Sequence, residues 1–136
     1  MANDKLLEIE IITPQRTVYA GKAQSITLPG TKAPFQVLYN HAPIVSSLEI
    51  GMIKIVDGNS KPVYFASTKG FIEVSKNVVS VLVESADESS EINTESVKAE
   101  LAELDEKIKK LTRKEADELN YQVKILENKL KVAGYK

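Results

Sequence analysis

The sequence has 136 residues, a net charge of −1, no cysteine and a single histidine, His41. The charge balance argues against nonspecific nucleic-acid binding, and the lack of cysteine excludes disulfides, thiol catalysis and Cys-ligated metal sites. One histidine leaves no histidine cluster, so no metal site is predicted. No apolar run reaches the ~18 residues of a membrane helix, and residues 1–5 show no signal-peptide pattern, so we expect a soluble, intracellular protein that is not an enzyme.

Proline and glycine divide the chain into two parts. All five prolines and five of the six glycines lie at or before Gly70, and residues 71–133 contain neither. Frequent turn residues followed by a long uninterrupted stretch predict strands first and helices second.

The first part, residues 1–86, is a succession of short apolar or alternating runs. Branched and aromatic residues dominate these runs, which suits half-buried strands. Turn residues such as Pro29-Gly30 and Asp57-Gly58-Asn59 separate them. The pattern predicts an N-terminal antiparallel β-sandwich, or flattened barrel. The clearest predicted strands are Leu7–Ile12, Ser25–Leu28, Phe35–Leu38, Met52–Val56, Val63–Ala66, Phe71–Val74 and Val78–Val83.

The second part, residues 87–136, is predicted to form a C-terminal two-helix antiparallel hairpin. A short acidic linker, residues 85–91, precedes it. Asn93 is expected to cap the first helix, and Thr112 begins the second with a Thr-x-x-Glu capping box. Each helix has one apolar stripe, and the two stripes form the seam of the hairpin. The stripes are Val97, Leu101, Leu104, Ile108 and Leu111, then Ala116, Leu119, Val123, Leu126, Leu130 and Ala133.

The joint between the two helices permits two arrangements. Residues 112–115 carry a helix-start pattern, yet no Gly or Pro interrupts residues 93–133. The sequence therefore allows a folded hairpin and also one continuous helix of ~60 Å. Because each stripe is too narrow to be buried against two partners at once, the two states should compete.

Five short segments of the first part resemble the epsilon subunit of bacterial F-type ATP synthase, the equivalent of the mitochondrial delta subunit. They occur in the same order and at matching intervals, and the helical pair follows them as in that family. The segments are Ile12-Thr13-Pro14, Leu28-Pro29-Gly30, Asn40-His41-Ala42-Pro43, Gly51-Met52-Ile53-Lys54-Ile55 and Lys69-Gly70-Phe71-Ile72-Glu73-Val74.

The resemblance implies a non-catalytic rotor subunit in the central stalk. In that family the sandwich lies against the gamma subunit and the c-ring and takes part in proton-driven ATP synthesis, on the cytoplasmic face of the plasma membrane. The helical part folds beside the sandwich or rises toward the catalytic beta subunits, where it restrains ATP hydrolysis. Two other classes stay open: a freestanding sandwich adaptor that dimerises through its helices, and an enzyme that depends on His41.

Two loops of the sandwich are the predicted contacts with gamma and the c-ring, residues 29–36 and 39–45. Lys32 lies in the first loop, where the family commonly has an acidic residue nearby, so polar contacts there would come from Lys32 and the backbone. Tyr39 stands where the family often has proline. His41 is expected to support this interface, because no nucleophile or phosphate-binding loop accompanies it. The alternative for the first loop is a solvated turn.

A run of cations marks the joint of the helices and is the predicted contact with an acidic surface of the catalytic beta subunits. The alternative is a solvated surface, and no aromatic residue interleaves as nucleic-acid binding would require. The cations are Lys107, Lys109, Lys110, Arg113 and Lys114.

No cofactor is predicted. Some members of the family bind ATP through an I-D-x-x-R-A segment. Here the aligned residues 92–97 have Asn93 in place of the acid and Ser96 in place of the arginine. Arg113 is the only arginine of the helical part, so bidentate phosphate recognition is weak and nucleotide binding is not expected.

Overall fold

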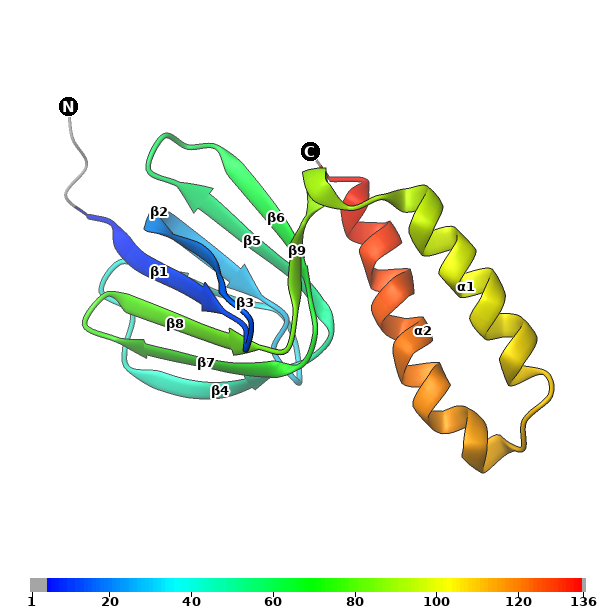
Figure 1. The fold of residues 1–136 in the computed structure, drawn as a ribbon. Helices are drawn as coiled ribbons and strands as arrows, with labels where there is room; N and C mark the ends of the chain where they lie inside the picture. The colour runs from blue at the N-terminus through cyan, green and yellow to red at the C-terminus, as the bar shows by residue number, and fades with distance from the viewer. Residues whose placement is uncertain (1–4, 136) are drawn as a thin grey trace.

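The computed structural model describes residues 5–135, which form a β-sandwich and a pair of helices (Figure 1). The strands are β1 (Leu7–Ile12), β2 (Thr17–Leu28), β3 (Phe35–Leu38), β4 (Ile44–Leu48), β5 (Gly51–Asp57), β6 (Pro62–Ser67), β7 (Gly70–Ser75), β8 (Val78–Val83) and β9 (Ala86–Glu88). They are followed by the 3-10 helix η1 (Ser89–Glu91) and by the helices α1 (Thr94–Ile108) and α2 (Arg113–Ala133).

The strands follow the order β4-β7-β8-β1-β2-β5-β6-β9, with β3 paired to β2. The long strand β2 joins the two layers, because its first half pairs with β1 and its second half with β5. A register irregularity between Ala23 and Ser25 marks the change. The predicted sandwich is confirmed. Its described strands are antiparallel apart from β1 and β8, which run parallel.

The core lies between the two layers and follows from simple alternation along the strands. In β7, Ile72 and Val74 point inward while Phe71 and Glu73 point outward. In β8, Val79, Val81 and Val83 take the inward positions. With period-two alternation one face of each strand is buried and the other is left for solvent or a partner.

The acidic segment 85–91, predicted as a linker, instead forms an edge strand of the sheet and a short 3-10 helix. Its residues form β9 and η1, and Ala86 and Glu88 lie opposite Ser67 and Phe65 of β6. The Ser85 N–H donates to Thr68 Oγ1 at 3.0 Å and fixes the entry to β9. The prediction failed because the pairing is made with a distant strand, and polar residues at a sheet edge carry little strand signal. A boundary after Ala86 falls within β9.

The helices begin where the capping residues predict. Asn93 Oδ1 accepts from the Ser96 N–H at 3.1 Å. Thr112 Oγ1 accepts from the Glu115 N–H at 3.3 Å and donates to the Glu115 carboxylate at 2.7 Å. The predicted hairpin is confirmed, with the helices packed on each other. Leu111 departs from the predicted seam, because it lies in the turn and is 36% exposed.

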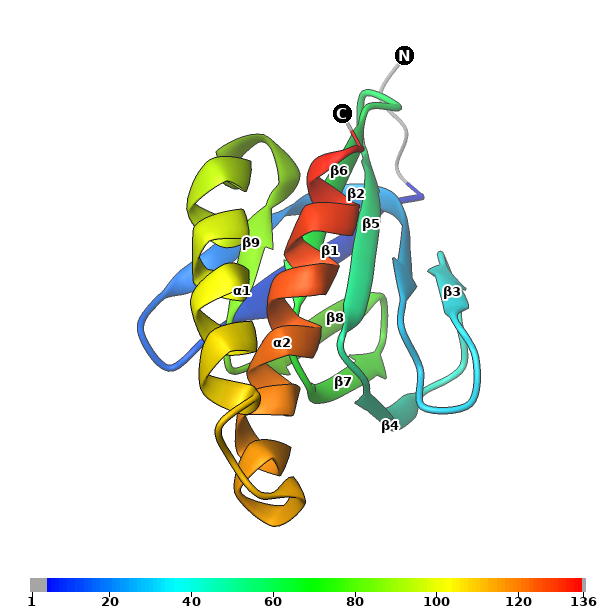
Figure 2. The same ribbon diagram turned by 90° about the vertical axis from the view of Figure 1, so that its right-hand side faces the viewer.

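Helix α2 has a second apolar face that the single-stripe prediction missed. It lies between α1 and the edge of the sandwich formed by β5 and β6 (Figure 2). Val132 is only 1% exposed, and the Asn128 side-chain N–H donates to the Gly51 carbonyl at 2.8 Å. At the same edge Lys129 lies 3.4 Å from Asp87, and the rings of Tyr135 and Tyr64 are 5.1 Å apart. Extending the arm, residues 92–135, would therefore break two interfaces, the one between α1 and α2 and the one between α2 and the sandwich.

Candidate functional site

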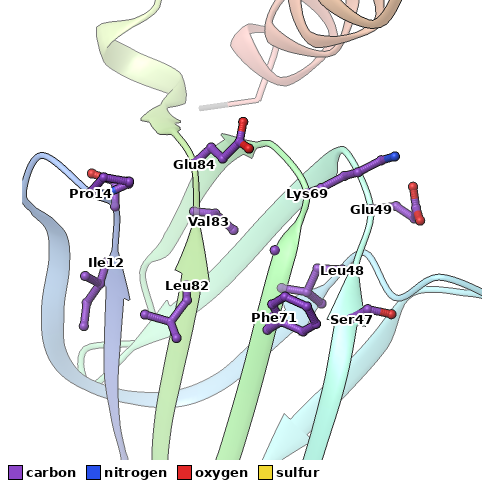
Figure 3. Close-up of a pocket in the computed structure, with 12 residues that line it drawn as sticks. Ile12, Pro14, Ser47, Leu48, Glu49, Lys69, Phe71, Leu82, Val83 and Glu84 are labelled. Carbon is purple, nitrogen blue, oxygen red and sulfur yellow. The ribbon is translucent and has the colours of Figure 1, made fainter.

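The outer face of strands β4, β7, β8 and β1 carries an apolar groove of about 610 Å³ (Figure 3). Phe71 and Leu82 line it and are 59% and 50% exposed, while Val45 beside it is 73% exposed. Exposed apolar side chains that gather in one hollow mark interaction surfaces more often than scattered ones do. The groove is therefore the first candidate for a binding site.

The strand register explains how the groove forms. Ser47 of β4 lies opposite Phe71 of β7, Phe71 opposite Leu82 of β8, and Leu82 beside Ile12 of β1. Figure 3 shows these four side chains in a row across the strands. Gly70 is required there, because a Cβ at this position would come within 2.0 Å of the Leu82 carbonyl oxygen. The strand pairing thus sets the spacing of this row, in which Phe71, Leu82 and Ile12 are apolar.

The helices leave this face uncovered. Helix α2 packs on the sandwich at β6 and β5, and α1 packs on α2. Lys69 links the groove to the arm, because its ammonium lies 5.3 Å from the centre of the Tyr121 ring. The groove is therefore accessible while the arm is folded.

The structure does not bring the two predicted contact loops together. Lys32 is exposed in the turn before β3, and the neighbouring Thr31 hydroxyl lies 2.8 Å from the Ser47 hydroxyl, at the groove side of β4. His41 is half-buried in the loop after β3, where its Nδ1 lies 2.7 Å from the Ala42 carbonyl. The two residues thus lie at opposite ends of β3.

The loop that contains Tyr39 and His41 is fixed by a pair of asparagines. The Asn40 N–H donates to Asn77 Oδ1 at 2.6 Å, and the Asn77 amide donates to Asn40 Oδ1 at 3.3 Å. Both residues have left-handed backbones, with φ of 65° and 66°, which asparagine tolerates better than most residues. Tyr39 is 37% exposed beside this anchor. The loop is an ordered and accessible surface.

The predicted cations all lie exposed around the turn between α1 and α2, which projects away from the sandwich (Figure 1). Lys109 makes an ion pair of 3.5 Å with Glu106, and both side chains are about 70% exposed. An exposed pair of this kind is worth ~0.5 kcal/mol or less. The positive tip, residues 107–114, is thus free to meet a partner.

The described part of the chain, residues 5–135, shows no group of three or more Asp, Glu or His side chains placed to hold a metal ion. Within the same residues no helix combines the length and the apolar character needed to cross a membrane.

The sequence prediction missed the groove and chose two loops, of which the one at residues 29–36 contacts the groove side of β4, through Thr31 and Ser47. A signal was present, because the inward pairs Ile72/Val74 and Val79/Val81 place Phe71 and Leu82 on the outward face with Glu73 and Ser80. Two large apolar residues on a face that is otherwise polar indicate a covered or binding surface. Their adjacency across β7 and β8 depends on the register, which only the structure gives.

The fold and the groove define a class, a β-sandwich that presents an apolar outer face and carries a helical hairpin on its edge. A family model described as "ATP synthase, Delta/Epsilon chain, beta-sandwich domain" matches residues 6–89. The chain belongs to this family, the ATP synthase epsilon chains.

Curated relatives support the assignment along most of the chain. The ATP synthase epsilon chain of Pelotomaculum thermopropionicum is 36% identical over 110 residues, which cover 81% of each chain. That of Rubrobacter xylanophilus is 32% identical over 130 residues, which cover 90% of this chain and 88% of the relative.

Solved structures show the same fold at lower identity. A chain of the Euglena gracilis mitochondrial ATP synthase, in a structure of OSCP/F1/c-ring, matches with a TM-score of 0.81 and 19% identity, over 96% of this chain and 82% of that one. A chain of the Tetrahymena thermophila mitochondrial ATP synthase, in a central stalk and c-ring structure, matches with a TM-score of 0.57 and 16% identity, over 98% and 99%.

Proposed function

We propose that the chain is a non-catalytic central-stalk subunit of an F-type ATP synthase and that the groove on its outer face docks on the gamma subunit. The observation that carries this proposal is the apolar pair Phe71 and Leu82. These two residues are neighbours across β7 and β8, are exposed, and are left uncovered by the arm. Because the chain belongs to the epsilon family, the complex in which it would dock is an ATP synthase. Apolar residues at the centre of an interface usually provide most of its affinity.

The loops at residues 29–36 and 39–45 extend this contact to the c-ring. The second loop is the better-supported part, because Leu38 and Tyr39 are exposed next to the Asn40–Asn77 anchor. His41 acts in it as an interface residue. The subunit would then couple gamma to the c-ring during proton-driven ATP synthesis, at the cytoplasmic face of the plasma membrane.

The arm acts as a reversible brake on ATP hydrolysis. In the folded state α2 is held between α1 and the sandwich, and the cations of residues 107–114 face solvent. In the extended state these cations would meet an acidic surface of the catalytic beta subunits. The adaptor alternative, dimerisation through the arm, has less support because the seam around Leu104 and Leu126 is already buried within one chain.

Co-purification tests the docking proposal. A tagged full-length chain, expressed with the other subunits of its ATP synthase, should recover gamma and the catalytic subunits. The double variant Phe71→Ser/Leu82→Ser should recover at least tenfold less, since two central apolar anchors are lost. Leu111→Ser, which changes an exposed leucine at the arm tip, is the matched control and should bind normally. Equal recovery by the double variant would refute docking through the groove.

Hydrolysis by the reconstituted enzyme tests the brake. A chain that ends at Glu91 retains β9 and η1 and should still join the complex, whereas hydrolysis should rise relative to the full-length chain. Replacing the five tip cations with alanine should raise hydrolysis in the same direction. Unchanged hydrolysis on removal of the arm would show that it is no brake.

A further inference from the structure

Acidic residues lie on both sides of Phe71 and Leu82 along the strands. Two residues along the strands from Phe71 and Ile12, Glu73 of β7 and Glu10 of β1 flank Ser80 of β8. They lie two strands apart, ~10 Å, on the same outward face as Phe71 and Leu82. On the other side, Glu49 and Glu84 are part of the groove wall.

None of these four carboxylates takes part in an ion pair within residues 5–135. Glu10 lies between Ala20 and Ser80, and Glu73 between Val45 and Ser80. The ion pairs of residues 5–135 involve other side chains. Lys69, the cation of the groove wall, is placed over the Tyr121 ring of the arm. An occupant of the groove would therefore approach carboxylates on both sides of Phe71 and Leu82, with Lys69 as the cation among the described lining residues.

A docked partner that left these carboxylates dehydrated and unpaired would lose affinity, since a desolvated charge needs a counter-charge. A partner with cations at the matching positions would gain both attraction and faster association. The same charges disfavour acidic elements, among them α1 of this chain, whose exposed side carries Glu95, Glu100, Glu103, Asp105 and Glu106. Apolar contact supplies affinity, and the acidic rims select the occupant.

Building on the proposed docking to gamma, we infer that the docking element of gamma is an amphipathic segment with basic flanks. Its apolar side chains enter the groove over Phe71 and Leu82. Lysine or arginine residues on one flank lie opposite Glu10 and Glu73, and those on the other flank lie opposite Glu49 and Glu84. The epsilon chain thus recognises a basic amphipathic segment rather than an apolar surface alone.

The test measures the affinity of the full-length chain for the purified gamma subunit of its own enzyme, by titration calorimetry at 50, 150 and 500 mM NaCl. The native chain should bind more weakly as salt rises, since salt screens charge pairs at the rim of an interface. Glu10→Lys/Glu73→Lys should bind about tenfold more weakly at 50 mM NaCl and lose most of the salt dependence. Glu103→Lys, an equal charge change on exposed α1, is the control and should match the native chain.

The outcomes separate this inference from the docking proposal. Phe71→Ser should weaken binding at every salt concentration, because it removes an apolar contact, which salt does not screen. If Phe71→Ser weakens binding but Glu10→Lys/Glu73→Lys binds as tightly as the native chain, docking stands and the basic-flank inference is wrong. If the native chain does not bind gamma at all, both proposals fail. Circular dichroism of each variant confirms that the exposed substitutions leave the fold intact.

Discussion

The sandwich and the arm differ in how many apolar side chains they bury and in how completely they bury them. The sandwich encloses a continuous core, in which residues such as Ile55 and Val81 are fully buried between two layers. The arm has only a thin seam, where Val97, Leu104 and Leu126 are between 6% and 9% exposed. Apolar burial is the main stabilising term of a fold, so the two parts should differ in stability. The proposed roles, a sandwich that binds gamma and an arm that changes conformation, are consistent with this difference.

The largest expected effect is in the sandwich core. Ile55→Ala should lower the free energy of unfolding by about 3 kcal/mol, through lost burial and the cavity left behind. Urea unfolding followed by circular dichroism measures it. Val45→Ala, on a 73% exposed residue of the same domain, should stay within about 0.5 kcal/mol. A similar loss for both would mean that the core is not the stabilising element.

Leu104→Ala should affect the arm alone. The loss of about 2 kcal/mol falls on the seam with α2, because Leu104 packs there and not on the sheet. Amide hydrogen exchange should accelerate throughout α1 and α2 while β5, β7 and β8 keep their protection. Acceleration of the sandwich amides by the same factor would show that the two parts unfold as one unit.

The turn at Thr112 should set the balance between hairpin and continuous helix. Thr112→Ala removes the cap of α2, which costs about 1 kcal/mol, and favours a continuous helix. Thr112→Gly nearly retains the cap preference but disfavours the continuous helix by about 1 kcal/mol. Alanine should therefore raise the extended population relative to glycine by roughly tenfold.

Fluorescence energy transfer can follow this balance, because the chain has no cysteine and labels go only where one is introduced. Glu95→Cys and Lys131→Cys put labels at the base of the hairpin, close together when folded and ~54 Å apart in a continuous helix. Identical transfer in the alanine and glycine variants would contradict a switch at Thr112.

Asn128→Ala should loosen α2 from the sandwich by about 1 kcal/mol, the value of one hydrogen bond. The effect stays small because the Ser67 hydroxyl also donates to the Gly51 carbonyl, at 3.4 Å. Asn120→Ala, on an exposed position of the same helix, is the control. The measurement is hydrogen exchange in α2, and equal exchange in the two variants would exclude a latch at Asn128.

The smallest effect concerns pH. Burial, aided by the negative charge of Asp57, raises the pKa of Tyr19 above its usual 10.0. The pKa of Tyr19 is higher in the folded than in the unfolded chain. The stability that Tyr19 contributes through its protonated hydroxyl is therefore complete below pH 10 and declines as pH rises through the folded pKa. Tyr19→Phe should therefore lose less stability than the native chain between pH 10 and 11.5. The measurement is the melting temperature of each protein across this pH range. An equal decrease in the two proteins would contradict the prediction.

The sequence predicted the elements whose signals are local. The helix starts at Asn93 and Thr112 depend on side chains three residues from their partners, and both are confirmed. Strands such as β7 and β8 depend on alternation within six residues, which needs no knowledge of the rest of the chain.

The missed features depend on contacts between distant segments. β9 is a strand because β6 is beside it. The second buried face of α2, which includes Val132, exists because the helix packs against β6 and β5. The groove requires Phe71 and Leu82 to be adjacent, which follows from the β7–β8 register. The loops around Lys32 and His41 were chosen by resemblance, and their role in binding stays a prediction.

The parallel pairing of β1 with β8 has a consequence for how the chain folds during synthesis. Ile9 reaches its partner Val79 only after most of the sandwich has been made, so the first strand waits with one edge unpaired. Such long-range pairing slows folding. The arm is synthesised after the sandwich and meets a finished sheet at β6. A ribosome stalled before residue 83 would hold an incomplete sandwich, with β1 open to misfolding or aggregation.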